Sequence, residues 1–361
     1  MIADMQKWTP NIASIIEHAN QFHPNTEVVS RMVSGNIHKT NYSEVCTRSR
    51  KLASALEKDG YKEGDVIATL ALNTYRHLEM YYGISGMGGI NHTLNFRLHP
   101  EQAVYIINHA EDKVIFCETP FIPILEGLQE NLECVEKYII LCDTSEMPDT
   151  KLKNAISYEE YIKDGDENYE WPALADDAAC ALCYTSGTTG NPKGVLYSHK
   201  SNFLHAQAAL TAMRIDPEET ILMVVPLFHV LGWGIPYFGP MYGSKLVMPG
   251  MQMEGEPLYE LIEKEKVTLA FGVPTIWMGL LAYCRDNNKI LDSVNNTIIG
   301  GSALSLSTLQ EFDEVHNVNA IHAWGMTEMS PLGVTNLPTS AMENMNKQDK
   351  YAIQLKQGRP I

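Results

Sequence analysis

Short apolar runs alternate along the chain with longer amphipathic periods. The apolar runs predict strands at 66–72, 113–117, 138–142, 179–184, 221–225, 246–248, 269–273, 297–300 and 320–323. Periods typical of helices lie between them, at 42–58, 76–87, 100–110, 200–213, 257–264, 274–284 and 307–313. Because strands that alternate with helices form parallel sheets with helices on their faces, the pattern predicts an α/β fold.

The polar, acidic segment 143–177 interrupts this pattern. Irregular segments of this kind separate domains, so we expect a first α/β unit at 1–175 and a second at 176–361. The final segment, 337–357, is also polar, and the last four residues resemble a turn into a strand. We therefore expect the chain to be a truncated piece of a longer protein.

One stretch, 220–244, contains no charged residue and is long enough to span a bilayer. Three prolines and four glycines interrupt it, and proline breaks a helix. We interpret the stretch as a buried strand, a loop and a short helix, without a transmembrane segment.

Composition excludes several partners. Lys and Arg number 27 against 44 Asp and Glu, a net charge of −17, so the chain has no basic footprint for nucleic acid or anionic lipid. Its seven cysteines are scattered, and only Cys180 and Cys183 have a spacing typical of metal or redox sites. No second pair or nearby His completes a metal set, so we expect two buried thiols on a strand. Reduced cysteines indicate the cytoplasm.

A glycine- and hydroxyl-rich segment follows the predicted strand at 179–184 and precedes the predicted helix at 200–213. It reads Tyr-Thr-Ser-Gly-Thr-Thr-Gly-Asn-Pro-Lys-Gly over 184–194. The glycines let the backbone approach a ligand closely, and successive N–H groups in such a loop form an anion nest. Since the hydroxyls add donors and Lys193 adds a positive charge, the segment predicts a polyphosphate-binding loop.

The spacing differs from the P-loop of GTPases and kinases, G-x-x-x-x-G-K-[ST]. Pro192 stands five positions after Gly187, and Gly194 follows Lys193 where Ser or Thr would bind Mg²⁺. A conventional NTPase is therefore disfavoured. A flexible linker of the same composition is the structural alternative, which a place between a buried strand and a helix disfavours.

The loop resembles the phosphate-loop signature of the adenylate-forming superfamily, which contains acyl-CoA synthetases, luciferases and nonribosomal peptide adenylation domains. Three further segments resemble that family in the same order: Pro226-Leu-Phe-His229, Gly300-Gly-Ser-Ala303 and Trp324-Gly-Met-Thr-Glu328. The resemblance covers essentially the whole chain and points to bacterial medium- and long-chain fatty acyl-CoA synthetases and methylthiopropionate–CoA ligases. It implies two helix-covered, mainly parallel sheets packed together, the large N-terminal part of such enzymes, with an incomplete C-terminal end.

The resemblance also implies the ligands: ATP, Mg²⁺, coenzyme A and a small-molecule carboxylic acid. The nucleotide-binding residues that it implies are Thr185, Ser186, Gly187, Thr188, Thr189, Gly190, Lys193, Gly301, Ser302, Ala303, Trp324, Gly325 and Thr327. Catalytic roles are implied for Lys193, Thr327, Glu328 and His229, and acid-binding roles for His229, Trp233 and Gly301. Thr185 and Glu328 are the implied Mg²⁺ ligands, since Mg²⁺ prefers one or two carboxylates plus phosphate oxygens.

Several of these residues also have a structural interpretation. Glu328 could face the N-terminal end of a helix dipole, and Trp324, where the family usually has Tyr, could be a core residue. The glycine pair at 300–301 could form only a turn. His229 could be a satisfied core histidine instead of part of the acyl entrance, and Trp233 a packing anchor instead of a tunnel gate.

The acid is expected to be apolar, a fatty or methylthio acid. Relatives that adenylate amino acids place an Asp at the position of His229, which pairs with the ammonium group. No carboxylate occurs between 220 and 244 here, and an unpaired ammonium in so apolar a wall is costly.

Family members continue past the last residue of this chain with a small C-terminal domain, absent here, that carries a catalytic lysine and rotates to admit CoA. We expect the parent protein to be a complete ligase of lipid metabolism that releases AMP and pyrophosphate, and this chain to bind nucleotide with little or no turnover. A homodimer is the family's expectation. Two alternatives stay open: a non-catalytic nucleotide- or acyl-binding fragment, and another adenylate-forming enzyme, luciferase-like or an adenylation domain.

Overall fold

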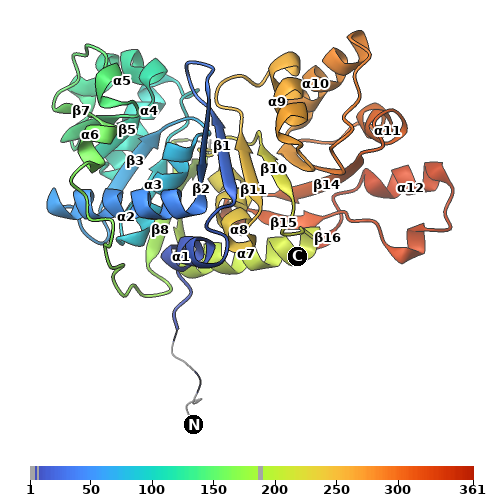
Figure 1. The fold of residues 1–361 in the computed structure, drawn as a ribbon, viewed down its shortest axis with the longest axis horizontal. Helices are drawn as coiled ribbons and strands as arrows, with labels where there is room; N and C mark the ends of the chain where they lie inside the picture. Colours follow the sequence, from blue (N-terminus) through green and yellow to red (C-terminus); the bar gives the residue numbers. More distant parts are fainter. Residues whose placement is uncertain (1–4, 6–7, 186–189) are drawn as a thin grey trace.

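The computed structural model describes residues 5, 8–185 and 190–361. Two mainly parallel sheets with helices on their faces make up the fold, which confirms the predicted architecture (Figure 1). The helices predicted at 42–58 and 100–110 have the predicted bounds, and the other predicted elements shift by at most a few residues.

The first sheet has seven strands. Only its edge pair, β8 and β9, is antiparallel, and the other neighbours are parallel. In spatial order the strands are β7 (Ala155–Ser157), β6 (Lys137–Ile140), β5 (Val114–Cys117), β3 (Val66–Leu70), β4 (Ile90–Thr93), β8 (Ala179–Thr185) and β9 (Lys193–Ser198).

The second sheet has nine strands. Its centre is parallel, and antiparallel strands occur only at its two ends. In spatial order the strands are β16 (Arg359–Pro360), β15 (Leu332–Thr335), β14 (Asn319–Gly325), β13 (Asn296–Ile299), β12 (Leu269–Gly272), β10 (Thr220–Met223), β11 (Lys245–Met248), β1 (Glu27–Arg31) and β2 (Ile37–Asn41).

The strands of each sheet come from both sides of the predicted boundary between 1–175 and 176–361. The β1–β2 hairpin joins the nine-stranded sheet, whereas β8 and β9 join the seven-stranded sheet. The division of the chain into those two units therefore stays a prediction, and the sheets themselves interleave along the sequence.

Twelve α-helices cover the sheets in the part of the chain described. They are α1 (Ile12–Phe22), α2 (Tyr42–Lys58), α3 (Tyr75–Gly86), α4 (Pro100–Ala110), α5 (Ile122–Leu128), α6 (Tyr158–Ile162), α7 (His199–Met213), α8 (Ile235–Tyr242), α9 (Gly255–Glu265), α10 (Pro274–Asp286), α11 (Leu306–Glu314) and α12 (Lys347–Gln354).

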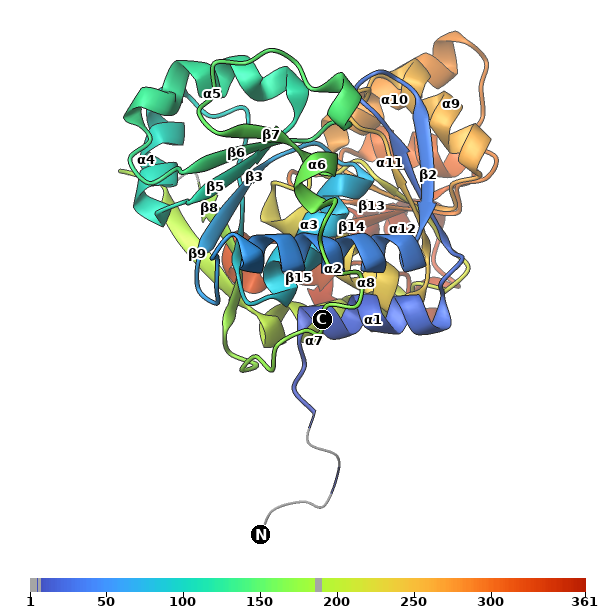
Figure 2. The same cartoon turned by 60° about the vertical axis from the view of Figure 1, so that its left-hand side comes forward.

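One apolar core joins the two sheets. It contains side chains of α1, α7 and α8 together with residues of β8 and β10, and α3 contacts strands of both sheets. Figure 2 shows α1 running beside α2 and α7. Helices α9, α10 and α11 cover the other face of the nine-stranded sheet, and α4 and α5 cover one face of the seven-stranded sheet (Figure 1).

The uncharged stretch at 220–244 forms β10, a short 3₁₀ turn at Val230–Gly234 and α8, as predicted. Across the described residues we find no helix with the length and apolar character that a membrane span requires. Cys180 and Cys183 are both buried free thiols on β8, which confirms their structural interpretation.

Three buried histidines give the fold a defined pH dependence. Burial lowers the pKa of His77, His199 and His205 to about 4. A free histidine has a pKa of about 6.5, so at lower pH the unfolded chain takes up protons that the folded chain does not accept. The contribution of these residues to stability is therefore present above about pH 6.5 and is lost as the pH falls toward about 4.

We predict that His199→Asn makes this loss smaller. The Nδ1 atom of His199 accepts the N–H of Ile12 at 3.2 Å, and an Asn oxygen can accept the same proton without titrating. Between about pH 6.5 and 4, the unfolding free energy of the variant should fall less steeply, by up to about 1.4 kcal/mol per pH unit. Urea unfolding at a series of pH values measures both slopes, and equal slopes would contradict the prediction.

Candidate functional site

The predicted phosphate loop connects two antiparallel strands. Thr185 at the end of β8 pairs with Lys193 at the start of β9, so both ends of the loop are held in register. The helix predicted at 200–213 is confirmed as α7, and between the loop and this helix lies a strand that the pattern did not predict, β9. This strand is largely exposed and lacks the apolar run that marks a buried strand. The predicted ligands Ser186, Gly187, Thr188 and Thr189 lie outside the described residues.

The carboxyl ends of the parallel strands bring the other predicted segments together. The chain reaches His229 after β10, Gly300 and Gly301 after β13, and Trp324 at the end of β14. Since β10, β12, β13 and β14 are parallel neighbours, these ends meet at one edge of the nine-stranded sheet. Ligands of α/β proteins bind at this kind of edge.

A cavity of about 220 Å³ lies between the two sheets at this edge. Tyr184, Thr185 and Pro192 line it from the phosphate-loop hairpin, and His229 and Thr327 line it from the nine-stranded sheet. Thr185 and Thr327 therefore line the same space, although 142 positions separate them in the sequence.

A second, smaller cavity of about 70 Å³ adjoins the first. Its lining is formed by His229, Val230, Trp233, Gly300, Gly301, Ala323, Trp324, Gly325, Met326, Pro331 and Leu332. Because His229 and Val230 line both cavities, the two spaces lie side by side at these residues. His229, Trp233, Gly301, Trp324 and Gly325 thus line one space.

Trp324 and His229 are not satisfied core residues. The Trp324 side chain is 44% exposed at the second cavity, so its indole face is available to a ligand. His229 lies beyond β10 rather than within the strand, and it is exposed toward the cavities. The surrounding wall desolvates its ring, and with the nearby positive charge of Arg97 this lowers the pKa of His229, so the imidazole is neutral at neutral pH.

Trp233 lies in a left-handed turn. Val230, Leu231 and Trp233 all have positive φ values, 41°, 43° and 51°. For residues with a Cβ atom this conformation costs about 1–2 kcal/mol each, so the surrounding structure must impose it. The turn lays the Trp233 indole against Gly300, where a Cβ atom would come within 3.0 Å of the ring. A Cβ atom at position 300 would therefore require the Trp233 ring to shift by a few tenths of an ångström.

The Thr327–Glu328 segment is attached to the phosphate-loop hairpin. Thr327 begins a three-residue 3₁₀ helix, Thr327–Met329. The hydroxyl group of Tyr197 on β9 donates to the Thr327 carbonyl oxygen at 2.5 Å. Glu328 is exposed beside this bond, and a helix of one turn has too small a dipole to explain an acid there.

Some predicted residues lie at the margin of the two cavities. Gly190, Lys193, Ser302, Ala303 and Glu328 are exposed and do not contribute to the lining of either cavity. Their predicted roles would require a ligand that extends beyond the enclosed space, as a triphosphate does.

Sequence patterns gave no signal for two residues that organise the site. Tyr197 lies on the strand that the pattern missed, and His205 lies within α7. The Nε2 atom of His205 accepts the N–H of Leu332 at 3.0 Å, and a Cβ atom on Gly234 would come within 2.9 Å of its ring. His205 therefore connects two walls of the smaller cavity.

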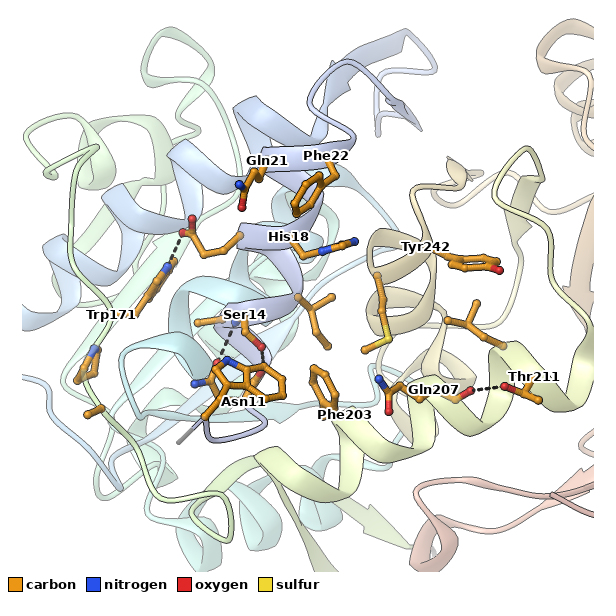
Figure 3. A pocket seen from close by; sticks show the side chains of 18 residues that line it. Asn11, Ser14, His18, Gln21, Phe22, Trp171, Phe203, Gln207, Thr211 and Tyr242 are labelled. Carbon is orange, nitrogen blue, oxygen red and sulfur yellow. Dashed lines mark hydrogen bonds between the residues drawn. The ribbon is translucent and has the colours of Figure 1, made fainter. Parts of the chain in front are cut away.

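A larger groove, of about 1050 Å³, lies elsewhere (Figure 3). It is formed between α1, α7 and α8, with Trp171 at one side, and none of the predicted site residues lines it. The groove is therefore larger than the two cavities, but the motif residues do not take part in it.

The donor groups fit a magnesium ion that is bound mainly through phosphate. No cluster of three or more His, Cys, Asp or Glu side chains occurs within residues 8–185 and 190–361, so the described part of the chain offers no all-protein metal cage. Mg²⁺ needs only one or two carboxylates when phosphate oxygens and water complete its shell. The exposed carboxylate of Glu328 and the hydroxyl group of Thr185 are oxygen donors of this kind.

Comparison with known proteins identifies one family over nearly the whole chain. The family model for AMP-binding enzymes matches residues 16–361. A medium-chain-fatty-acid–CoA ligase of Ectopseudomonas oleovorans is 43% identical over the whole chain, which covers 66% of that ligase. A 3-methylmercaptopropionyl-CoA ligase of Ruegeria pomeroyi is 42% identical, again over the whole chain and 67% of the relative. The chain thus spans about two thirds of the length of these curated relatives.

Solved structures share the fold at lower identity. An anthranilate–CoA ligase in complex with anthranoyl-AMP has a TM-score of 0.86 at 21% identity, covering all of this chain and 66% of the other. The N-terminal domain of FACL13 from Mycobacterium tuberculosis has a TM-score of 0.83 at 20% identity, covering 97% of this chain and 82% of the other.

Proposed function

Because the chain belongs to the family of AMP-binding enzymes, we propose that it is the large nucleotide-binding part of an acid–CoA ligase that forms an acyl-adenylate from ATP. One observation carries the proposal: Thr185 of the phosphate-loop hairpin lines one of two neighbouring cavities, Trp324 and Gly301 line the other, and His229 lines both. An acyl-adenylate needs such a site, since it combines a phosphate, a flat base and an apolar chain.

The nucleotide would lie across both cavities. Adenine would stack on the exposed indole of Trp324, and Gly301 and Gly325 would let it approach the backbone. The hydroxyl groups of Thr185 and Thr327 would donate to phosphate oxygens, and Lys193 would add its charge at the edge of the loop. Ser302, Ala303 and the remaining loop residues would complete the wall around the nucleotide.

The reaction itself requires little covalent help from the protein. A carboxylate oxygen of the acid would attack the α-phosphorus, and the bond to pyrophosphate would break. Thr185 and Glu328 would hold Mg²⁺, which when bound neutralises charge on the triphosphate. His229, kept neutral by its surroundings, would orient the carboxylate without pairing with it as an ion. In the complete protein the CoA thiol would then displace AMP from the acyl carbon.

The acid would be a fatty or methylthio acid. The names of the two relatives, a medium-chain-fatty-acid–CoA ligase and a 3-methylmercaptopropionyl-CoA ligase, support this class. The described lining of both cavities contains no carboxylate that could pair with an amino acid's ammonium group. Trp233, packed against Gly300 beside His229, would gate the entrance of the acyl chain.

Two further features complete the proposal. A cytoplasmic location is supported by the seven cysteines, all of which carry free thiols. A homodimer is the oligomeric state that the family leads us to propose.

The direct test of the function is acid-dependent exchange of labelled pyrophosphate into ATP by the purified chain. Because the small C-terminal domain with its lysine is absent, slow exchange is expected, and octanoate or 3-methylthiopropionate should support it whereas alanine should not. Exchange that alanine supports best would point to an adenylation domain instead. Nucleotide binding without exchange would favour the non-catalytic fragment.

Removing the proposed metal ligand should weaken only magnesium-dependent binding. In Glu328→Gln, the dissociation constant for ATP with Mg²⁺ is expected to rise about tenfold, because a neutral amide is a poor ligand for a hard cation. Binding of AMP without Mg²⁺ should be unchanged by calorimetry. Glu343→Gln is the matched control, since Glu343 is also exposed and contributes to neither cavity. An equal rise of the dissociation constant for ATP in both variants would show that the net charge of the chain, and not a metal ligand at 328, controls this binding.

Removing the proposed stacking surface should weaken AMP binding itself. Stacking of a base on an aromatic ring is worth about 1–3 kcal/mol, so Trp324→Ala should raise the dissociation constant for AMP by about tenfold or more. Trp8→Ala is the control, since Trp8 is a comparably exposed indole, 51% against 44%, that lines the groove of Figure 3. An AMP affinity that depends on Trp8 and not on Trp324 would place the nucleotide in that groove.

A further inference from the structure

The chain segment that leads to His229 is held by a side chain from the opposite sheet. Asn73, which follows β3 of the seven-stranded sheet, is 2% exposed. Its amide nitrogen donates to the carbonyl oxygens of Met223 at 2.8 Å and Val225 at 2.7 Å. Its amide oxygen accepts the N–H of Leu227 at 2.8 Å. The Asn73 carboxamide therefore fixes the backbone on the way from β10 to His229.

Three neighbours of Asn73 hold the same segment further along. Tyr81 on α3 donates its hydroxyl proton to the Leu227 carbonyl oxygen at 2.5 Å, and Tyr82 donates to the Pro236 carbonyl oxygen at 2.5 Å. Thr93 on β4 donates to the Phe228 carbonyl oxygen at 3.4 Å. All three side chains are buried, so no water competes for these oxygens.

The left-handed turn of His229 and Trp233 lies between these anchors. The backbone of Val230 and Leu231 lies close to the buried Cys183 thiol on β8, a weak acceptor. Inside the turn, the Gly232 N–H donates to the His229 carbonyl oxygen at 3.0 Å. Since left-handed backbone is unfavourable for Val, Leu and Trp, this local bonding is a poor support on its own. The anchors before and after the turn must keep it in place.

We propose that Asn73 and Tyr81 are positioning residues for the acid: they fix the turn so that His229 and Trp233 present one defined wall to the acyl group. This inference rests on the proposed function. It assigns a selective role to the two side chains, because their hydrogen bonds go to the segment that leads to His229, whereas Trp324 and Thr327 belong to other segments, 324–325 and 327–329. Their loss therefore affects recognition of the acyl group and leaves recognition of AMP intact.

Tyr81→Phe tests the inference with the least structural change. Its matched control is Tyr42→Phe: Tyr42 is also fully buried and donates to a backbone carbonyl oxygen, that of Ser244, at 2.5 Å. Calorimetry with the whole chain measures the dissociation constants of AMP and of a non-hydrolysable octanoyl-adenylate analogue. Tyr81→Phe is expected to weaken binding of the analogue about fivefold and binding of AMP less than about twofold. Tyr42→Phe should change neither by more than about twofold.

Asn73→Ala is the stronger variant. Asn336→Ala is its control, since the amide of Asn336 also donates to two backbone carbonyl oxygens, those of Ile353 and Lys356, both at 2.6 Å. Asn73→Ala is expected to weaken binding of the analogue about tenfold or more relative to AMP. If Asn73→Ala does not fold, the Tyr81→Phe comparison decides alone.

The outcomes distinguish a failure of this inference from a failure of the proposed function. A selective loss of the analogue in Tyr81→Phe or Asn73→Ala, absent in the controls, supports the inference. Equal losses of both ligands, or no change in their affinity ratio, overturn it while the proposed function stands. A wild-type chain that binds neither ligand overturns the proposed function itself.

Discussion

The apolar core between the two sheets is the constraint on which the site depends. One half of the cleft belongs to the β8–β9 hairpin, and the other half belongs to the carboxyl edge of the nine-stranded sheet. The core contains Cys183 and Tyr197 from the hairpin together with Leu227 and Ala323 from the other sheet. Burial of these side chains from water therefore holds the phosphate loop opposite the strand ends. Polar bonds such as Tyr197 to Thr327 then fix the distance across the cleft.

Electrostatics explain how an acidic chain can present a site for an anionic ligand. The net charge is −17, yet the described lining of both cavities consists of hydroxyl, amide, aromatic and apolar groups. Neutral donors at a fixed geometry can stabilise phosphate charge without a positive field. The basic groups Arg97 and Lys193 are placed at the margin, where they add charge locally.

The sequence predicted the motifs and most parallel strands because these have local signals. The buried strand β6 lies on the apolar run 138–142, and glycine at 300 marks a close approach of backbone and side chain. The exposed edge strand β9 has no such run and was missed. The left-handed turn was also missed, because nothing about Val230 or Leu231 favours that backbone. The contacts of Asn73 and Tyr197 with segments more than 120 positions away exist only through the packing of the two sheets.

A crystal structure of the chain with a non-hydrolysable octanoyl-adenylate analogue would test the central claim most directly. The account predicts adenine on the Trp324 face, the phosphate group between Thr185 and Thr327, and the acyl chain along His229 and Trp233. A ligand bound instead in the groove between α1, α7 and α8 would contradict it, and so would adenine bound away from the junction of the two cavities.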